Sequence, residues 1–138
     1  MIITICGSMQ FHKEMINGKE VLEKAGHTVI IPSGAYNEEV NEAFMNTDEE
    51  KINVKIEHDF IREHFRAIQE SDVILVLNYD KNGIKGYIGG NTFLEMGYAF
   101  GLGKKIFLLN PIPRMDYLTE MHAMQPSVLS GDLAKIID

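Results

Sequence analysis

Cysteine is nearly absent from this sequence, since Cys6 is the only one among its 138 residues. An internal disulfide framework is therefore excluded, and no group of cysteines and histidines has the spacing of a zinc finger. His58 and His64 are six residues apart, which places them on different sides of a helix and argues against a shared metal ion. The sequence therefore predicts no metal site and no other cofactor, and Cys6 is expected to be a small, buried apolar side chain.

Positive charge and long apolar runs are also scarce. Thirteen Lys and Arg residues stand against twenty Asp and Glu residues, which gives a net charge of −7. Duplex nucleic acid and anionic membranes both select clustered positive charge, so neither is expected as a main partner. No apolar run approaches the roughly 20 residues of a membrane span, and the N-terminus has no charged segment or cleavage site typical of a signal peptide. We therefore expect a soluble, cytoplasmic protein.

The composition is otherwise that of a folded globular protein. Hydrophobic residues make up 45% of the chain and charged residues 24%, as in ordinary soluble domains. The length fits one domain over residues 1–138, with a single sizeable core. Four short runs of β-branched or other apolar residues predict strands. These runs are Ile2–Ile5, Thr28–Ile31, Val73–Leu77 and Lys105–Leu109.

Between these runs, apolar residues recur at helical spacing. Residues 11–25 and 92–102 predict one helix each, and residues 49–70 predict a single long helix with an apolar stripe. The acidic residues 35–50 are expected to form a loop. A helix at about 116–124 and a short strand or helix near Leu133–Ile137 complete the chain. Strands that alternate with helices indicate right-handed crossovers, so we expect a doubly wound α/β fold with helices on both faces of a parallel sheet.

In sheets of this kind, ligands bind at the carboxyl ends of the strands. Four segments leave those ends, and three of them contain glycine. They are Cys6–Gln10, Pro32–Tyr36, Asn78–Asn91 and Asn110–Arg114. The sequence therefore places the functional site at this edge of the sheet.

The strongest local signal is a pair of glycines followed by a helix that contains a glutamate. Gly89 and Gly90 allow the backbone to approach a ligand closely, and the free N–H groups at the start of the next helix favour an anion. Glu95 is expected in the first turn of that helix, where an ionised carboxylate suits a nucleophile or an electrostatic stabiliser. Thr92 and Glu95 also have the spacing of a capping box, so a purely structural role for Glu95 stays open.

Two other segments supply candidate residues. Gly7 and Ser8 follow the first strand, where a hydroxyl and free N–H groups commonly contact a phosphate or ribose. His64 lies at the margin of the apolar stripe of the long helix, partway toward the carboxyl edge, and a structural role is the ordinary expectation for such a histidine. His58 and Asp59 lie further toward that edge and are the competing candidates for acid or base work.

Three motifs occur together in the chain: Gly7-Ser8, Ser71-Asp72-Val73-Ile74-Leu75-Val76 and Gly90-Asn91-Thr92-x-x-Glu95-Met96-Gly97-Tyr98-Ala99. With them the chain resembles the nucleoside 2-deoxyribosyltransferase superfamily, which includes the 2′-deoxynucleoside 5′-phosphate N-hydrolases. The resemblance spans most of the chain, from the first strand to about Leu109. It implies a flavodoxin-like sheet of about five parallel strands. It also implies cleavage of an N-glycosidic bond by a glutamate that attacks C1′ of the sugar.

The resemblance also implies roles for individual residues. Glu95 matches the nucleophile, and the residues around it match the pocket that holds the nucleoside. His64 stands where relatives carry an aspartate that works near the base, and a histidine can supply the proton that a departing base needs. Gly89 stands where relatives carry an aspartate or a serine near the 5′ group. The expected substrate-binding residues are Gly7, Ser8, Met9, Gly89, Gly90, Asn91 and Thr92.

Two hypotheses follow. In the first, the protein is an enzyme that cleaves a nucleoside or nucleoside 5′-monophosphate, or transfers its deoxyribosyl group, with Glu95 as nucleophile and His64 or Asp59 as acid/base. In the second, it is a module of the same fold that binds a nucleotide without catalysis, and Glu95 only caps its helix. In either case we expect a homo-oligomer, because relatives complete the pocket across subunits.

Overall fold

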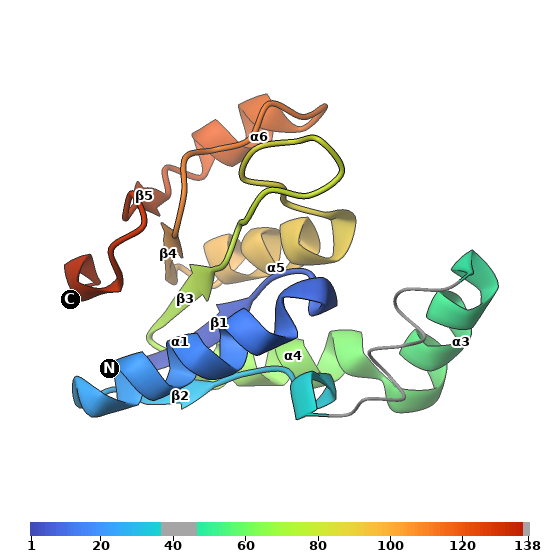
Figure 1. Cartoon of the computed structure of the whole chain (residues 1–138), viewed down its shortest axis with the longest axis horizontal. Coiled ribbons are helices and arrows are strands. Elements are labelled where there is room, and N and C mark those ends of the chain that lie inside the picture. Colours follow the sequence, from blue (N-terminus) through green and yellow to red (C-terminus); the bar gives the residue numbers. More distant parts are fainter. Residues whose placement is uncertain (37–46, 137–138) are drawn as a thin grey trace.

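A computed structural model describes residues 1–36 and 47–136 of the chain (Figure 1). Its centre is a five-stranded sheet in which every pairing is parallel. The strands are β1 (Ile2–Cys6), β2 (Thr28–Ile30), β3 (Val73–Val76), β4 (Lys105–Leu108) and β5 (Ser127–Val128). Their order across the sheet is β2-β1-β3-β4-β5. The expected doubly wound α/β fold is therefore confirmed, and the strand order reverses direction between β1 and β3.

Helices cover both faces of this sheet. The longer ones are α1 (His12–Lys24), α3 (Asp48–His58), α4 (Phe60–Glu70) and α5 (Gly90–Gly101), and a shorter one is α6 (Leu118–Ala123). Three 3₁₀ turns lie at Met9–Phe11, Ser33–Tyr36 and Leu133–Lys135. No helix among the described residues is long and apolar enough to cross a membrane.

Alternation along β1 divides the core into two clusters. Ile3 and Ile5 point to one face and pack with Met15 and Leu22 of α1. Cys6 points to the other face, in the cluster that holds side chains of α4 and α5. On that face α4 and α5 lie side by side, and the rings of Phe65 and Tyr98 stack with their centroids 4.2 Å apart. Because Cys6 ends its strand beneath these two helices, it lies where both can reach it.

The long helix expected over residues 49–70 is wrong, since the structure contains two helices there. The break is at Asp59, which adopts a left-handed conformation with φ of 48° and ends α3 one residue before α4 begins. Aspartate is among the few non-glycine residues that tolerate this conformation. The apolar residues of 49–70 recur at helical spacing on both sides of Asp59. This pattern therefore gave no sign that the chain changes direction there.

Of the strand or helix expected near Leu133–Ile137, the helical alternative is the one found, and the last strand lies earlier in the chain. β5 is Ser127–Val128, whereas Leu133–Lys135 forms a 3₁₀ turn capped by the Asp132 side chain, which accepts from Ala134 N at 3.0 Å. A two-residue edge strand has too little apolar pattern to be recognised. Of the acidic segment expected to be a loop, residues 37–46 lie outside the described residues.

A buried amide joins the carboxyl ends of β3 and β4. Asn78 is fully buried; its Nδ2 donates to the carbonyl oxygens of Asn110 (2.9 Å), Pro111 (3.2 Å) and Gly86 (3.3 Å). Its Oδ1 accepts from Asn110 N at 2.9 Å. Gly86 has φ of 66°, and a Cβ there would lie 2.8 Å from the Pro111 carbonyl oxygen. These contacts fix the start of the loop that runs from β3 to α5.

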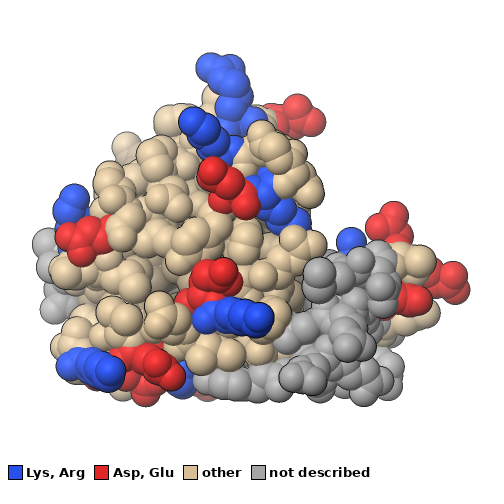
Figure 2. Space-filling model, viewed as in Figure 1, with Lys and Arg blue, Asp and Glu red and all other residues tan. Residues whose placement is uncertain are grey.

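The surface carries mixed charge. On the face shown in Figure 2, basic and acidic side chains lie interspersed over a mostly uncharged surface, and the described residues form no continuous basic patch there. This agrees with the net charge of −7.

Candidate active site

Two adjoining cavities open at the carboxyl edge of the sheet, where β1 and β3 end. The inner cavity has a volume of about 40 Å³ and is bounded by α4 and α5; the outer cavity has a volume of about 160 Å³ and lies over the start of α5. Gly7, Met9 and Asn91 line both of them. The remaining inner residues are Pro32, Gly34, Phe60, Ile61, His64, Phe65 and Glu95. The site is therefore one apolar recess joined to one polar recess.

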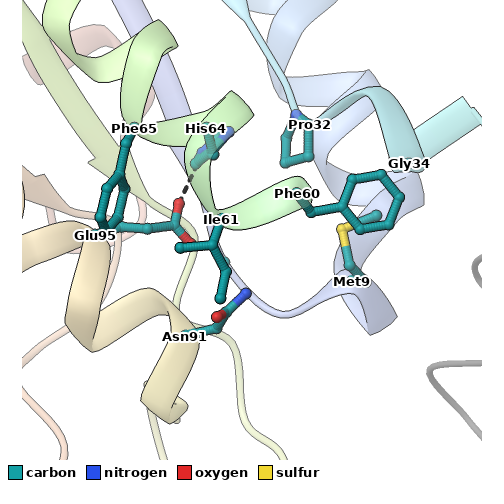
Figure 3. Close-up of a pocket in the computed structure, with 10 residues that line it drawn as sticks. Met9, Pro32, Gly34, Phe60, Ile61, His64, Phe65, Asn91 and Glu95 are labelled. Carbon is teal, nitrogen blue, oxygen red and sulfur yellow. Dashed lines mark ion pairs between the residues drawn. The ribbon is translucent and has the colours of Figure 1, made fainter. Parts of the chain in front are cut away.

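Glu95 projects from α5 across the inner cavity toward α4 (Figure 3). It is only 7% exposed, and its Oε2 lies 2.8 Å from His64 Nε2. The helix begins at Gly90 after Gly89 as N-cap, so Glu95 is in the second turn and no side chain caps the helix. The expected first-turn position and the capping box are therefore wrong. The carboxylate faces a histidine and a cavity instead of the amides of its own helix.

His64 is a second buried residue of this recess, and its charge is tied to that of Glu95. Burial, the largest single influence, lowers the pKa of His64, but the negative charge of the nearby Glu95 carboxylate raises it, as does a backbone hydrogen bond with Ile5. The net effect raises the pKa above its usual value. The imidazolium form of His64 is therefore favoured beside the carboxylate. The two opposite charges stabilise each other in a site that holds little water.

Cys6 completes the buried cluster and was missed as a site residue. Its Sγ lies 3.4 Å from His64 Nε2, on the side away from solvent. Burial and the negative charge of Glu95 raise the pKa of the thiol well above its usual value, so the protonated thiol is favoured. The sequence showed only a cysteine at the end of an apolar run, and nothing local distinguishes such a residue from an ordinary core residue.

The seven residues expected to bind substrate all lie together in the outer cavity. They are Gly7, Ser8, Met9, Gly89, Gly90, Asn91 and Thr92. Gly7 has φ of 158°, and a Cβ there would lie 3.1 Å from the Leu77 carbonyl oxygen, so the close passage of the first loop past the end of β3 favours glycine.

Two lysines in the outer cavity were not predicted. Lys51 of α3 and Lys81 of the loop after β3 both line it, and Lys81 Nζ donates to Ser8 Oγ at 3.0 Å. Nζ of Lys81 also lies 5.0 Å from the centre of the Tyr87 ring. Partial burial and the charge of Lys51 lower the pKa of Lys81. The two lysine side chains repel each other, and the other residues that line the cavity are uncharged. An anionic ligand between the lysines would therefore be stabilised.

Asp59, the alternative acid/base residue, is not brought to either cavity. Its side chain is 51% exposed, and Oδ2 lies 3.6 Å from Arg62 Nη1 at the surface. Asp59 has a left-handed backbone conformation and lies at the bend between α3 and α4. His58, considered with it, has a side chain outside those that the structure describes.

No protein-family model matches the sequence, and no curated protein is significantly similar to it. Two solved structures share its fold. One is the 2-deoxyribosyltransferase of the psychrotolerant bacterium Bacillus psychrosaccharolyticus, with a TM-score of 0.52 and 22% identity over 78% of this chain and 71% of that one. The other is the CMP N-glycosidase BcmB of Clostridium botulinum, with a TM-score of 0.50 and 18% identity over 93% of this chain and 85% of that one.

Both likenesses are below 25% identity and concern the fold, and the two proteins are a 2-deoxyribosyltransferase and a CMP N-glycosidase. The resemblance is thus confirmed in the fold, which this chain shares with one enzyme that transfers a deoxyribosyl group and one that cleaves a nucleotide.

Proposed function

We propose that the protein cleaves the N-glycosidic bond of a nucleoside 5′-monophosphate, or transfers its deoxyribosyl group, through a covalent intermediate on Glu95. The observation that carries this proposal is the Glu95 carboxylate, which is buried beside His64 and faces a cavity that continues into a recess with two lysines. The two fold neighbours, a deoxyribosyltransferase and a CMP N-glycosidase, support the same reaction class.

The chemistry follows that of retaining glycoside hydrolysis. A carboxylate oxygen of Glu95 attacks C1′, the bond between C1′ and the base breaks, and its electron pair leaves with the base, which takes up a proton from water. The resulting glycosyl ester is then attacked at C1′ by water or by a second base, which releases Glu95. Hydrolysis and transfer differ only in this acceptor. The apolar walls of the inner cavity, Phe60 and Ile61 among them, keep water scarce around the ester.

His64 acts on the nucleophile in this scheme. In a displacement at C1′ the attacking and leaving atoms stand on opposite faces of the sugar carbon, and Nε2 of His64 is 2.8 Å from an oxygen of the attacking group. An imidazolium at this distance attracts the carboxylate and holds it in one orientation. We therefore assign His64 to positioning Glu95, in place of the expected role as proton donor to the base.

The outer cavity suits the 5′-phosphate. Lys51 and Lys81 supply positive charge, and the N-terminus of α5 supplies free N–H groups from Gly90 and Asn91 toward the same recess. The Ser8 hydroxyl already accepts from Lys81 and can donate to a phosphate oxygen. Since Gly89 replaces the polar residue that relatives carry, the lysines offer a different means of holding the anion.

The Lys81→Met variant is expected to raise KM for a nucleoside 5′-monophosphate about 10- to 100-fold, which is the effect of losing one charge-assisted hydrogen bond of ~1.5–3 kcal/mol. The KM for the corresponding nucleoside should change less than about threefold, because it carries no phosphate. Initial rates at varied concentrations of both substrates measure this. Lys85→Met is the control, since Lys85 is an exposed residue of the same loop outside the outer cavity. Equal losses for nucleoside and nucleotide in the Lys81 variant would refute the phosphate assignment.

A panel of nucleosides and their 5′-monophosphates, analysed by chromatography for free base, tests the function itself. We expect base release from at least one monophosphate. We also expect exchange with added free base if the protein is a transferase. A non-catalytic module is not favoured, because Glu95 faces a cavity and His64 and does not cap its helix. Thermal stabilisation of the protein by nucleotides, with no product and no base exchange for any member of the panel, would instead support the non-catalytic module.

The homo-oligomer stays a prediction. Leu94 and Phe100 of α5, and Leu102 just beyond it, are exposed apolar side chains, but the spacing of six between the first two places them on different sides of the helix.

A further inference from the structure

We propose that Cys6, His64 and Glu95 form a binding site for a thiophilic divalent cation, Zn²⁺ in the first place. Among the residues that the structure describes, these three bring a thiol, an imidazole nitrogen and a carboxylate oxygen within 4.8 Å of one another. All three side chains are buried, and they come from β1, α4 and α5. No spacing in the sequence predicted such a site, because its members lie far apart along the chain, with 58 residues between the positions of Cys6 and His64, and on three different elements.

The distances are close to those of a zinc site. Zinc binds thiolate sulfur at ~2.3 Å and imidazole nitrogen or carboxylate oxygen at ~2.0–2.2 Å, which at tetrahedral angles separates S from N by about 3.6 Å and N from O by about 3.4 Å. Here Cys6 Sγ and His64 Nε2 are 3.4 Å apart, and His64 Nε2 and Glu95 Oε2 are 2.8 Å apart. The second distance is shorter than that of a zinc site, so metal binding requires the Glu95 carboxylate to move away from His64 by about 0.6 Å.

A second observation points to a missing ligand. Oε2 of Glu95 is buried and, although close to His64 Nε2, has no hydrogen bond of acceptable geometry. A single ring nitrogen faces both the sulfur and the oxygen and cannot direct one N–H at two acceptors. A cation between the three atoms would satisfy all of them at once, with the lone pair of Nε2 directed at the metal.

The donor set favours zinc over the common hard cations. Thiolate and imidazole select Zn²⁺, whereas Mg²⁺ and Ca²⁺ prefer oxygen ligands throughout. When the metal binds, Cys6 releases its thiol proton and His64 releases the imidazolium proton on Nε2, and the thiolate and the Glu95 carboxylate together balance the two positive charges of the cation. The buried site would then be neutral, which removes most of the electrostatic penalty for placing an ion there.

Three protein ligands leave the fourth position of the metal open. Glu95 and His64 line the inner cavity, whereas Cys6 lies behind them, so the open position faces the recess from which a sugar would approach. A bound metal would occupy the lone pairs with which Glu95 attacks C1′. Inhibition by zinc is therefore the expected consequence, and this consequence alone rests on the proposed function.

Cobalt provides the test, because a thiolate bound to Co²⁺ absorbs in the near ultraviolet whether or not the protein has activity. The full chain, freed of metal with a chelator, is titrated with Co²⁺ and then with Zn²⁺. We expect a thiolate-to-cobalt band that saturates at one equivalent and disappears when Zn²⁺ is added. Cys6→Ala should abolish the band and weaken Zn²⁺ binding at least tenfold, a loss that even residues outside the ligand set can cause.

Glu95→Gln, which keeps the shape of the side chain, should also weaken Zn²⁺ binding at least tenfold. This variant tests the site if the Cys6→Ala protein does not fold. His122→Gln removes an exposed histidine of α6 and should change neither the band nor the affinity. Absence of the band in the wild-type chain overturns the site, as does zinc affinity unchanged in Glu95→Gln. If the band forms without any nucleotide cleavage, the metal site stands and the proposed function fails; if cleavage occurs without the band, the reverse holds.

Discussion

Glu95→Gln is expected to lower the rate of base release at least 10³-fold, equivalent to ~4 kcal/mol of lost transition-state stabilisation. The amide cannot form the glycosyl ester, and it carries no negative charge to stabilise the positive charge that develops on the sugar ring. Single-turnover chromatography of the preferred monophosphate measures the loss. In the wild-type protein, intact mass after rapid quenching should show one added pentosyl phosphate group, and the variant should show none.

Binding should survive this substitution, because Glu95 lies in the inner cavity and the phosphate contacts lie in the outer one. We expect nucleotide-induced thermal stabilisation of the Glu95→Gln protein to remain close to that of the wild type. Glu70→Gln, which neutralises an exposed carboxylate at the end of α4, is the matched control and should leave turnover unchanged. A Glu95→Gln protein with more than a tenth of the wild-type rate would remove the nucleophile assignment, whatever its stability.

The sequence predicted the parts of this fold that local pattern controls. β1 and β3 are short apolar runs that end in glycine or a polar residue, and such runs identify central parallel strands because both of their faces are buried. The break at Asp59 could not be predicted, because the apolar period continues through it and the left-handed backbone depends on how α3 and α4 pack.

The same contrast applies to the site. The glycine loops were recognised because each lies directly after a strand or before a helix, and the strand order alone brings those loops to one edge. Tertiary packing places Cys6 and Lys81 in the site. Cys6 lies there because the last residue of β1 points to the face covered by α4 and α5. Lys81 lies there because of the path of the long loop after β3. Neither property has a local signature.

Asn78→Ala is expected to lower the free energy of unfolding by about 3 kcal/mol or more. The substitution removes one amide and leaves four buried or part-buried backbone groups without their partner, and each unsatisfied group costs roughly 1–3 kcal/mol, offset in part by water and local adjustment. Urea unfolding followed by circular dichroism measures the change. Asn17→Ala is the control: Asn17 is exposed on α1, where alanine is the better helix former, and its effect should be within about 0.5 kcal/mol.

The Asn78 amide also connects stability with the site. It holds Gly86 and the segment after β4, and the loop that passes through Gly86 continues to Gly89 and the start of α5. Loosening this anchor should therefore raise KM for the nucleotide under conditions in which the variant is still folded, because the backbone N–H groups over the outer cavity lose their fixed arrangement. A loss of stability below 1 kcal/mol would show that the amide is replaceable by water, and the loop would then need another anchor. A large loss with unchanged KM would show that α5 holds its own N-terminus in place, independently of the loop that leads to it.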